Sequence, residues 1–142
     1  MKVIVRPETL AVTGCNAIGD IHCELSRGVR FPATDWNDFV VVVLGWWIAQ
    51  VLPLRCGFEG EAELRFMDGP FRIRIVNHGY EAGIECFSGR CSVFLDRCDI
   101  GGFYQSLMDA ALRTAAFCRR NGLVTADLKI LEDLIEQGKS DD

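Results

Sequence analysis

The clearest pattern in the chain is a run of four segments in which apolar and polar side chains alternate. The alternating segments are residues 61–66, 71–75, 82–86 and 91–95. The turns between them fall at Asp68-Gly69, Asn77-His78-Gly79 and Ser88-Gly89. The pattern predicts an antiparallel meander with one buried face and one face in solvent. In the last segment we expect Cys91, Val93 and Leu95 on the buried face, so Phe94 is expected to point outward.

Residues 36–51 are apolar on nearly every side and are the hardest segment to assign. Four consecutive valines favour a strand. Thr34 or Asp35 can cap a helix, however, and the length of the run and Pro53 at its end also favour one. We predict a central buried helix with Trp46 or Trp47 packed against a sheet.

Two further helices are expected near the C-terminus. Asp99 can cap the first, which runs to about Arg120 and stops at Gly122. Its apolar face comprises Phe103, Leu107, Ala110, Ala111, Thr114 and Cys118. Thr125 can cap the second, which ends at Gly138. Its stripe comprises Leu128, Leu131, Leu134 and Ile135.

The N-terminal part is weakly patterned. Residues 10–13 and 21–25 suggest short strands, with residues 14–20 as the turn region between them. The resulting order, β-β-α-β-β-β-β-α-α, predicts one α+β domain over residues 1–142. In it, the antiparallel meander packs against the central apolar helix and the two C-terminal helices.

Composition narrows the function classes. The chain has 142 residues, of which 49% are hydrophobic and 25% charged, as in ordinary globular proteins. Its net charge of −5 argues against a nucleic-acid binder and is compatible with a basic protein partner. The N-terminus shows no secretory signal, and the apolar run at 39–49 is too short to cross a bilayer. We therefore expect a cytoplasmic protein without a membrane partner.

Residue types that carry chemistry are present, but no arrangement of them forms a motif. The seven cysteines are scattered without a CxxC pair, so we expect no metal site and mainly buried thiols. A disulfide between Cys86 and Cys91 across a hairpin is the alternative. His22 and His78 have no identifiable catalytic partner, and neither GxSxG nor a P-loop occurs. The sequence predicts no catalytic residue and no cofactor, so the protein is expected not to be an enzyme.

Charged residues on the solvent face of the meander form the one constellation of interest. The candidate partner-binding residues are Glu61, Glu63, Arg65, Arg72, Arg74, Glu81 and Glu85, with Phe94 as an apolar anchor. Such a face either carries cross-strand ion pairs in solvent or docks a partner. The last helix offers a second, more acidic surface through Asp127, Glu132, Asp133 and Glu136.

Four short stretches in the central half of the chain carry a resemblance to a known group. They are Phe31-Pro32, Trp36-Asn37-Asp38-Phe39, Leu44-Gly45-Trp46-Trp47 and the hairpin Phe66-Met67-Asp68-Gly69-Pro70-Phe71. In these the chain resembles small immunity proteins of bacterial polymorphic-toxin systems, including contact-dependent inhibition loci. The resemblance implies a cytosolic, non-enzymatic inhibitor that binds a cognate toxin domain, and an acidic surface would suit a basic nuclease toxin. It assigns no binding residue.

Two other functions stay open at this point. One is a small enzyme or ligand-binding domain with a pocket between the sheet and the tryptophan-bearing helix, using His78, Asp68 or a cysteine. The other is a homo-oligomeric subunit that associates through surplus apolar surface on residues 36–51.

Overall fold

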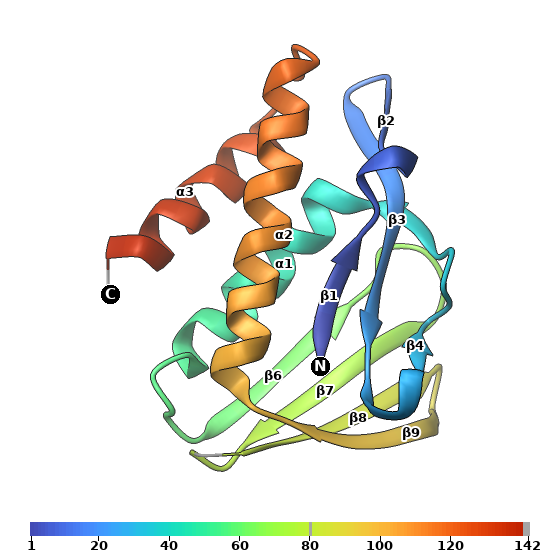
Figure 1. Ribbon diagram of the computed structural model, residues 1–142, viewed down its shortest axis with the longest axis vertical. Helices are drawn as coiled ribbons and strands as arrows, with labels where there is room; N and C mark the ends of the chain where they lie inside the picture. The colour runs from blue at the N-terminus through green and yellow to red at the C-terminus, as the bar shows by residue number, and fades with distance from the viewer. Residues whose placement is uncertain (80, 141–142) are drawn as a thin grey trace.

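The alternating segments form the expected meander in the computed structural model, which describes residues 1–79 and 81–140 (Figure 1). The strands are β6 (Gly60–Arg65), β7 (Phe71–Asn77), β8 (Ala82–Ser88) and β9 (Cys91–Cys98), hydrogen-bonded in that order. One face buries Leu64, Ile73, Ile75, Ile84 and Cys86. The helices lie on that side, so the fold is α+β, as predicted.

The last strand presents the face opposite to the one predicted. Cys86 pairs with Phe94 but Phe87 pairs with Ser92, so Val93 is an extra residue in a β-bulge. The bulge reverses the alternation, because side chains change face at every residue. Phe94 therefore packs against the core, whereas 52% of Val93 and 70% of Leu95 are exposed. Cys91 is exposed as well, so the expected burial of this face was wrong.

A second sheet is built around one long N-terminal strand. Strand β3 (Asn16–Glu24) pairs antiparallel with each of the other four. These are β1 (Lys2–Val5), β2 (Ala11–Thr13), β4 (Arg30–Phe31) and β5 (Asn37–Phe39), with 3-10 turns η1 (Pro7–Thr9) and η2 (Ser26–Gly28) between strands. Residues 16–20 were expected in a turn and lie in β3 instead. Gly19 is needed there by packing, because a Cβ would lie 2.8 Å from Leu10 Cδ2.

The central helix is α1 (Val40–Val51), which begins four residues later than predicted. Strand β5 takes the preceding residues, and neither Thr34 nor Asp35 caps the helix. Trp47 is wholly buried, whereas Trp46 is 44% exposed. Pro53 lies in the short 3-10 segment η3 (Leu52–Leu54) that follows the helix. Most of α1 is buried against its neighbours, so the helix leaves little of the surplus apolar surface expected for an oligomer.

Both C-terminal helices start at the predicted caps. Asp99 Oδ2 accepts a hydrogen bond from Gly102 N at 2.8 Å at the start of α2 (Ile100–Arg120). Thr125 Oγ1 accepts one from Leu128 N at 3.1 Å before α3 (Ala126–Ser140). Helix α3 continues through Gly138, which was expected to end it. Glycine is required there because a Cβ would lie 2.3 Å from the Tyr104 hydroxyl of α2.

None of the helices in the described part of the chain combines the length and the apolar character needed to cross a membrane.

A buried carboxylate joins the two sheets. Asp38 has no exposed surface, and its Oδ2 accepts hydrogen bonds from Trp36 Nε1 at 3.0 Å and Met67 N at 3.1 Å. Oδ2 also accepts from Asp68 N at 3.3 Å, and Oδ1 accepts from Phe39 N at 2.7 Å. These bonds compensate the burial of the carboxylate. Asp38 thereby fixes the β6–β7 turn against the start of α1.

Aromatic side chains pack around this junction. The Trp36 ring lies 4.9 Å from that of Phe71, and the Trp47 ring lies 5.0 Å from that of Phe66, both edge to face. Trp47 Nε1 also donates to Arg65 O at 2.7 Å, which satisfies a carbonyl on the outer edge of β6. The Phe31 ring lies 5.6 Å from that of Phe71, so all four stretches behind the immunity-protein resemblance meet at this junction.

Candidate protein-binding face

The side of the meander turned away from the helices is uncovered by any described element (Figure 1). We call it the outer face. From the strand register it comprises Glu61, Glu63, Arg65, Arg72, Arg74, Val76, Gly83, Glu85, Phe87, Ser92, Leu95 and Arg97. Six of the eight residues proposed from the sequence lie on it. Glu81 directly precedes β8 at its margin, and Phe94 lies on the opposite side.

Ion pairs occupy much of the outer face, and one of them, Arg65 with Glu63, lies within β6. Arg74 Nη2 lies 2.8 Å from Glu61 Oε1, and Arg65 Nε lies 2.8 Å from Glu63 Oε1. The Arg97 guanidinium lies farther from its partner, 3.7 Å from the carboxylate of Glu81. These pairs are exposed, so each contributes at most about 1 kcal/mol to folding.

Opposite charges balance on this surface. The arginines are Arg65, Arg72, Arg74 and Arg97, and the glutamates are Glu61, Glu63, Glu81 and Glu85. The net charge of −5 therefore resides elsewhere on the molecule. A partner that docks here meets charges of both signs. Such a pattern fixes the orientation and the specificity of binding, whereas it attracts the partner little through net charge.

Apolar side chains lie among these charges. Leu95 is 70% exposed and pairs with Glu85 across β8 and β9. The Arg72 guanidinium stacks over the Phe87 ring, with its carbon 4.0 Å from the ring centroid. Leu95, rather than Phe94, is thus the exposed apolar anchor of the face.

Strict alternation through the bulge places Leu95 on the buried face, so neither Leu95 nor Arg97 was predicted on the outer face. A signal for the correct face was present in Arg97. Because Arg97 follows Leu95 by two residues, both side chains share a face, and a guanidinium is rarely buried without a partner.

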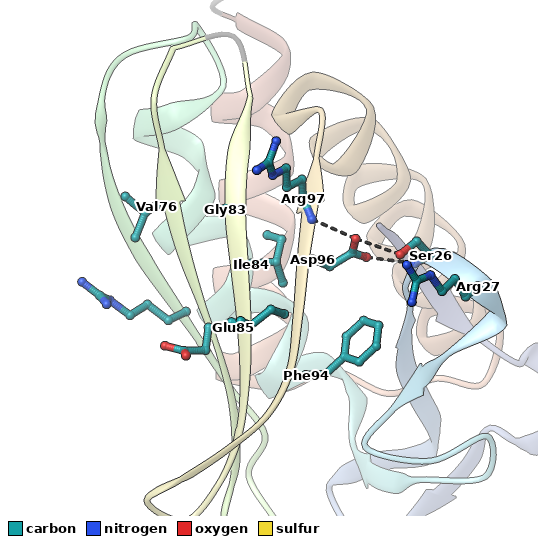
Figure 2. A pocket seen from close by; sticks show the side chains of 11 residues that line it. Ser26, Arg27, Val76, Gly83, Ile84, Glu85, Phe94, Asp96 and Arg97 are labelled. Atoms are coloured by element: carbon teal, nitrogen blue, oxygen red, sulfur yellow. Dashed lines mark hydrogen bonds between the residues drawn. The ribbon is translucent and has the colours of Figure 1, made fainter.

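A shallow depression of about 640 Å³ runs from the outer face over β9 to the η2 turn (Figure 2). Val76 and Glu85 lie on one side of β9, and Phe94 and Ser26 lie on the other. Gly83 contributes no side chain to the part on the outer face, so the sheet is hollowed there. In the depression, the Gly83 backbone and the Glu85 carboxylate lie beside the exposed Leu95 side chain.

Asp96 anchors the η2 turn to the rim of this depression. Its Oδ2 accepts from Ser26 N at 2.9 Å, and its Oδ1 accepts from Ser26 Oγ and Arg97 N, each at 2.8 Å (Figure 2). Burial alone raises the pKa of Asp96, but these hydrogen bonds outweigh it and lower the pKa below its usual value. The carboxylate is therefore held ionised and β9 is held beside η2.

The acidic surface expected on α3 is largely neutralised by ion pairs. Glu132 binds Arg119 of α2, and Lys129 Nζ lies 3.0 Å from Asp133 Oδ1. Lys139 Nζ lies 3.1 Å from Glu136 Oε1. An amphipathic helix with paired surface charges accounts for this pattern.

Groups with catalytic potential lie apart from the outer face. His22 is buried in β3 with its Nδ1 unpaired in the described chain, and His78 is exposed in the β7–β8 turn. Cys23, Cys86, Cys98 and Cys118 are buried free thiols, whereas Cys15, Cys56 and Cys91 are exposed ones. Cys86 and Cys91 are not linked. Over residues 1–79 and 81–140, no group of three or more histidine, cysteine or acidic side chains is placed to hold a metal ion.

A scan against protein-family models, a search of curated proteins and a search of solved structures each found no match to this chain. The function is therefore argued from the surface itself.

Proposed function

We propose that the chain is a non-enzymatic protein-binding module that holds its partner on the outer face. The observation that carries the proposal is Leu95, an apolar side chain that is 70% exposed on the edge strand β9, beside the Arg97–Glu81 ion pair, on a face that no described helix covers. Interfaces commonly combine a central apolar anchor with a polar rim. Burying the Leu95 side chain contributes about 2 kcal/mol, while the surrounding charges set orientation.

The partner we propose is a bacterial toxin domain, which the chain neutralises by binding it in the cytoplasm. This part rests on the resemblance to immunity proteins. The residues behind the resemblance, such as Asp38 and Trp36, serve the interior junction between the sheets. None of the four stretches contributes a residue to the outer face. The residues of that face can therefore differ from one immunity protein to another and fit one cognate toxin each, while the residues of the junction keep the fold.

A capture experiment with paired variants tests the proposal. Tagged wild type, Leu95→Asp and Ile130→Asp are used as baits in a lysate of the source organism, washed at high salt to remove loosely held charge partners. Ile130 of α3 is the matched control, because it is an aliphatic residue with 54% exposure away from the outer face. We expect one stoichiometric protein on wild type and Ile130→Asp and its loss on Leu95→Asp. Equal capture by all three baits contradicts the use of the outer face.

A growth assay then tests neutralisation. The captured protein is expressed in a bacterial host with and without this chain. Growth arrest by the protein alone, relieved by wild type and by Ile130→Asp but not by Leu95→Asp, supports an immunity function. A captured protein that is harmless by itself leaves the binding proposal standing and refutes the toxin.

A further inference from the structure

A second cavity lies on the other side of the molecule, between α2 and the N-terminal sheet. Its volume is about 260 Å³. It is lined by Val5, Pro7 and Leu10 from the β1–β2 region and by Arg113, Thr114, Ala116, Phe117 and Arg120 from α2. The walls are mainly apolar. It shares no residue with the outer face and lies away from α1, where a pocket was expected.

Two arginines stand beside this cavity without an acidic partner. Arg113 and Arg120 are exposed, and neither forms an ion pair or side-chain hydrogen bond within residues 1–79 and 81–140. They are seven residues apart on α2, which places them two turns and about 10.5 Å apart along one side of the helix. The neighbouring Arg119, by contrast, is bound to Glu132. Two unpaired guanidiniums next to an apolar cavity favour an anion with an apolar body.

Thr114 on the cavity wall supplies an independent observation. The residue is wholly buried, and its hydroxyl has no hydrogen-bond partner in the described chain. A helical threonine ordinarily bonds the carbonyl three or four residues earlier, and a buried polar group without a partner is unfavourable. A ligand that enters the cavity can satisfy this hydroxyl.

We propose that the cavity binds a small organic carboxylate whose body is a single ring or short chain. A dry cavity of about 150 Å³ is enough for benzene, so 260 Å³ has room for a ring with a short acidic arm. The apolar body lies between Phe117 and Leu10, and the carboxylate is held by Arg113 and Arg120. Thr114 supplies one further hydrogen bond. The site is separate from the outer face and stands or falls independently of it.

The probe is 3-phenylpropionate, compared with the uncharged 3-phenylpropanol by NMR titration of the full chain. We expect saturable shifts confined to the cavity residues, with a Kd on the order of 1 mM for a ligand this small. The alcohol should bind about tenfold more weakly, because it lacks the charge-assisted hydrogen bonds. Equal binding of acid and alcohol, or no saturable shift with the acid, overturns the proposal.

Variants separate ligand binding from folding. Arg113→Gln with Arg120→Gln should weaken the acid about tenfold and leave the alcohol unchanged, whereas the control Arg90→Gln in the distant β8–β9 turn should change neither. Thr114→Val removes the buried hydroxyl, so it should raise Tm while weakening the acid severalfold. If the acid does not bind and the double arginine variant instead weakens capture of a protein partner, the cavity receives a partner's side chain and the carboxylate proposal is wrong.

Discussion

The carboxylate of Asp38 accepts a hydrogen bond from the backbone amide of Met67 at 3.1 Å, and this contact ties the N-terminal sheet to the meander. The same oxygen also accepts from Trp36 and Asp68. Strands β6 and β7 of the outer face are joined by the turn that Asp38 binds. The rigidity of the outer face therefore depends on this junction.

Asp38→Asn should destabilise the protein by about 3 kcal/mol, because the amide cannot accept at both positions and leaves buried N–H groups unpaired. Urea unfolding measures the change. Asp68→Asn is the control, since Asp68 is exposed and its side chain forms no hydrogen bond or ion pair in the described chain. It should change stability by less than about 0.5 kcal/mol. Similar losses in the two variants would refute the role of Asp38.

Gly69→Ala should be more destabilising than Gly89→Ala, although both glycines have positive φ angles, +72° and +61°. The left-handed conformation costs each alanine about 1–2 kcal/mol. Only at Gly69 would the added Cβ also lie 2.9 Å from the Trp36 ring, whereas the space around Gly89 is open. Thermal unfolding of the pair isolates this packing term. Equal decreases in Tm for the two variants would mean that the Trp36 ring moves aside without cost, and would contradict tight packing at Gly69.

Stability should fall as the solution is acidified through pH 6.5, in part because of His22. Burial, the largest cause, lowers the pKa of His22 below 6.5, and the nearby Arg30 lowers it further. The unfolded chain therefore binds a proton on His22 at a pH where the folded chain does not. The free energy of unfolding is then lost from about pH 6.5 down to the folded pKa, with a slope of at most about 1.4 kcal/mol per pH unit.

Urea titrations between pH 8 and pH 5.5 test this slope. His22→Leu should flatten the curve, whereas the exposed-site control His78→Gln should retain it. A slope unchanged by His22→Leu would place the titration elsewhere.

The folded protein should react with three equivalents of iodoacetamide at pH 8, at the exposed Cys15, Cys56 and Cys91. Burial raises the pKa of Cys86 to about 12 and that of Cys98 to about 11, so neither supplies thiolate at this pH. Peptide mass spectrometry of protein alkylated with and without denaturant counts the sites. Rapid labelling of Cys86 in the folded state would contradict the packing of β8.

The sequence predicts well those elements that local chemistry determines. Alternation locates the meander, and Asp99 and Thr125 mark the starts of their helices because each side chain caps its own backbone. Asp38 was wrongly predicted to lie within the central helix, because its partners are far away in the sequence. It lies where a first helical turn was expected, but its carboxylate binds the distant β6–β7 turn, and the helix starts only after it.

Tertiary packing determined what the sequence could not show. Residues 14–20 suggest a turn, yet Gly19 lies within β3, where β5 pairs with it and Leu10 packs over it. The bulge at Val93 exchanges Phe94 for Leu95 on the outer face, and in the sequence only Arg97, two residues after Leu95, indicates the change. The cavity beside α2 was missed as well. Thr114 was correctly expected on the buried stripe, but its unpaired hydroxyl became visible only in three dimensions.

The most direct test of the outer face is the affinity of the captured partner, measured by titration calorimetry. Leu95→Asp should weaken binding about thirtyfold, because it replaces the proposed apolar anchor by a charge. Ile130→Asp should stay within about twofold of wild type, since Ile130 lies on α3, away from the outer face. Wild-type affinity in Leu95→Asp, with a loss in Ile130→Asp, would contradict the account and move the binding surface to the helices.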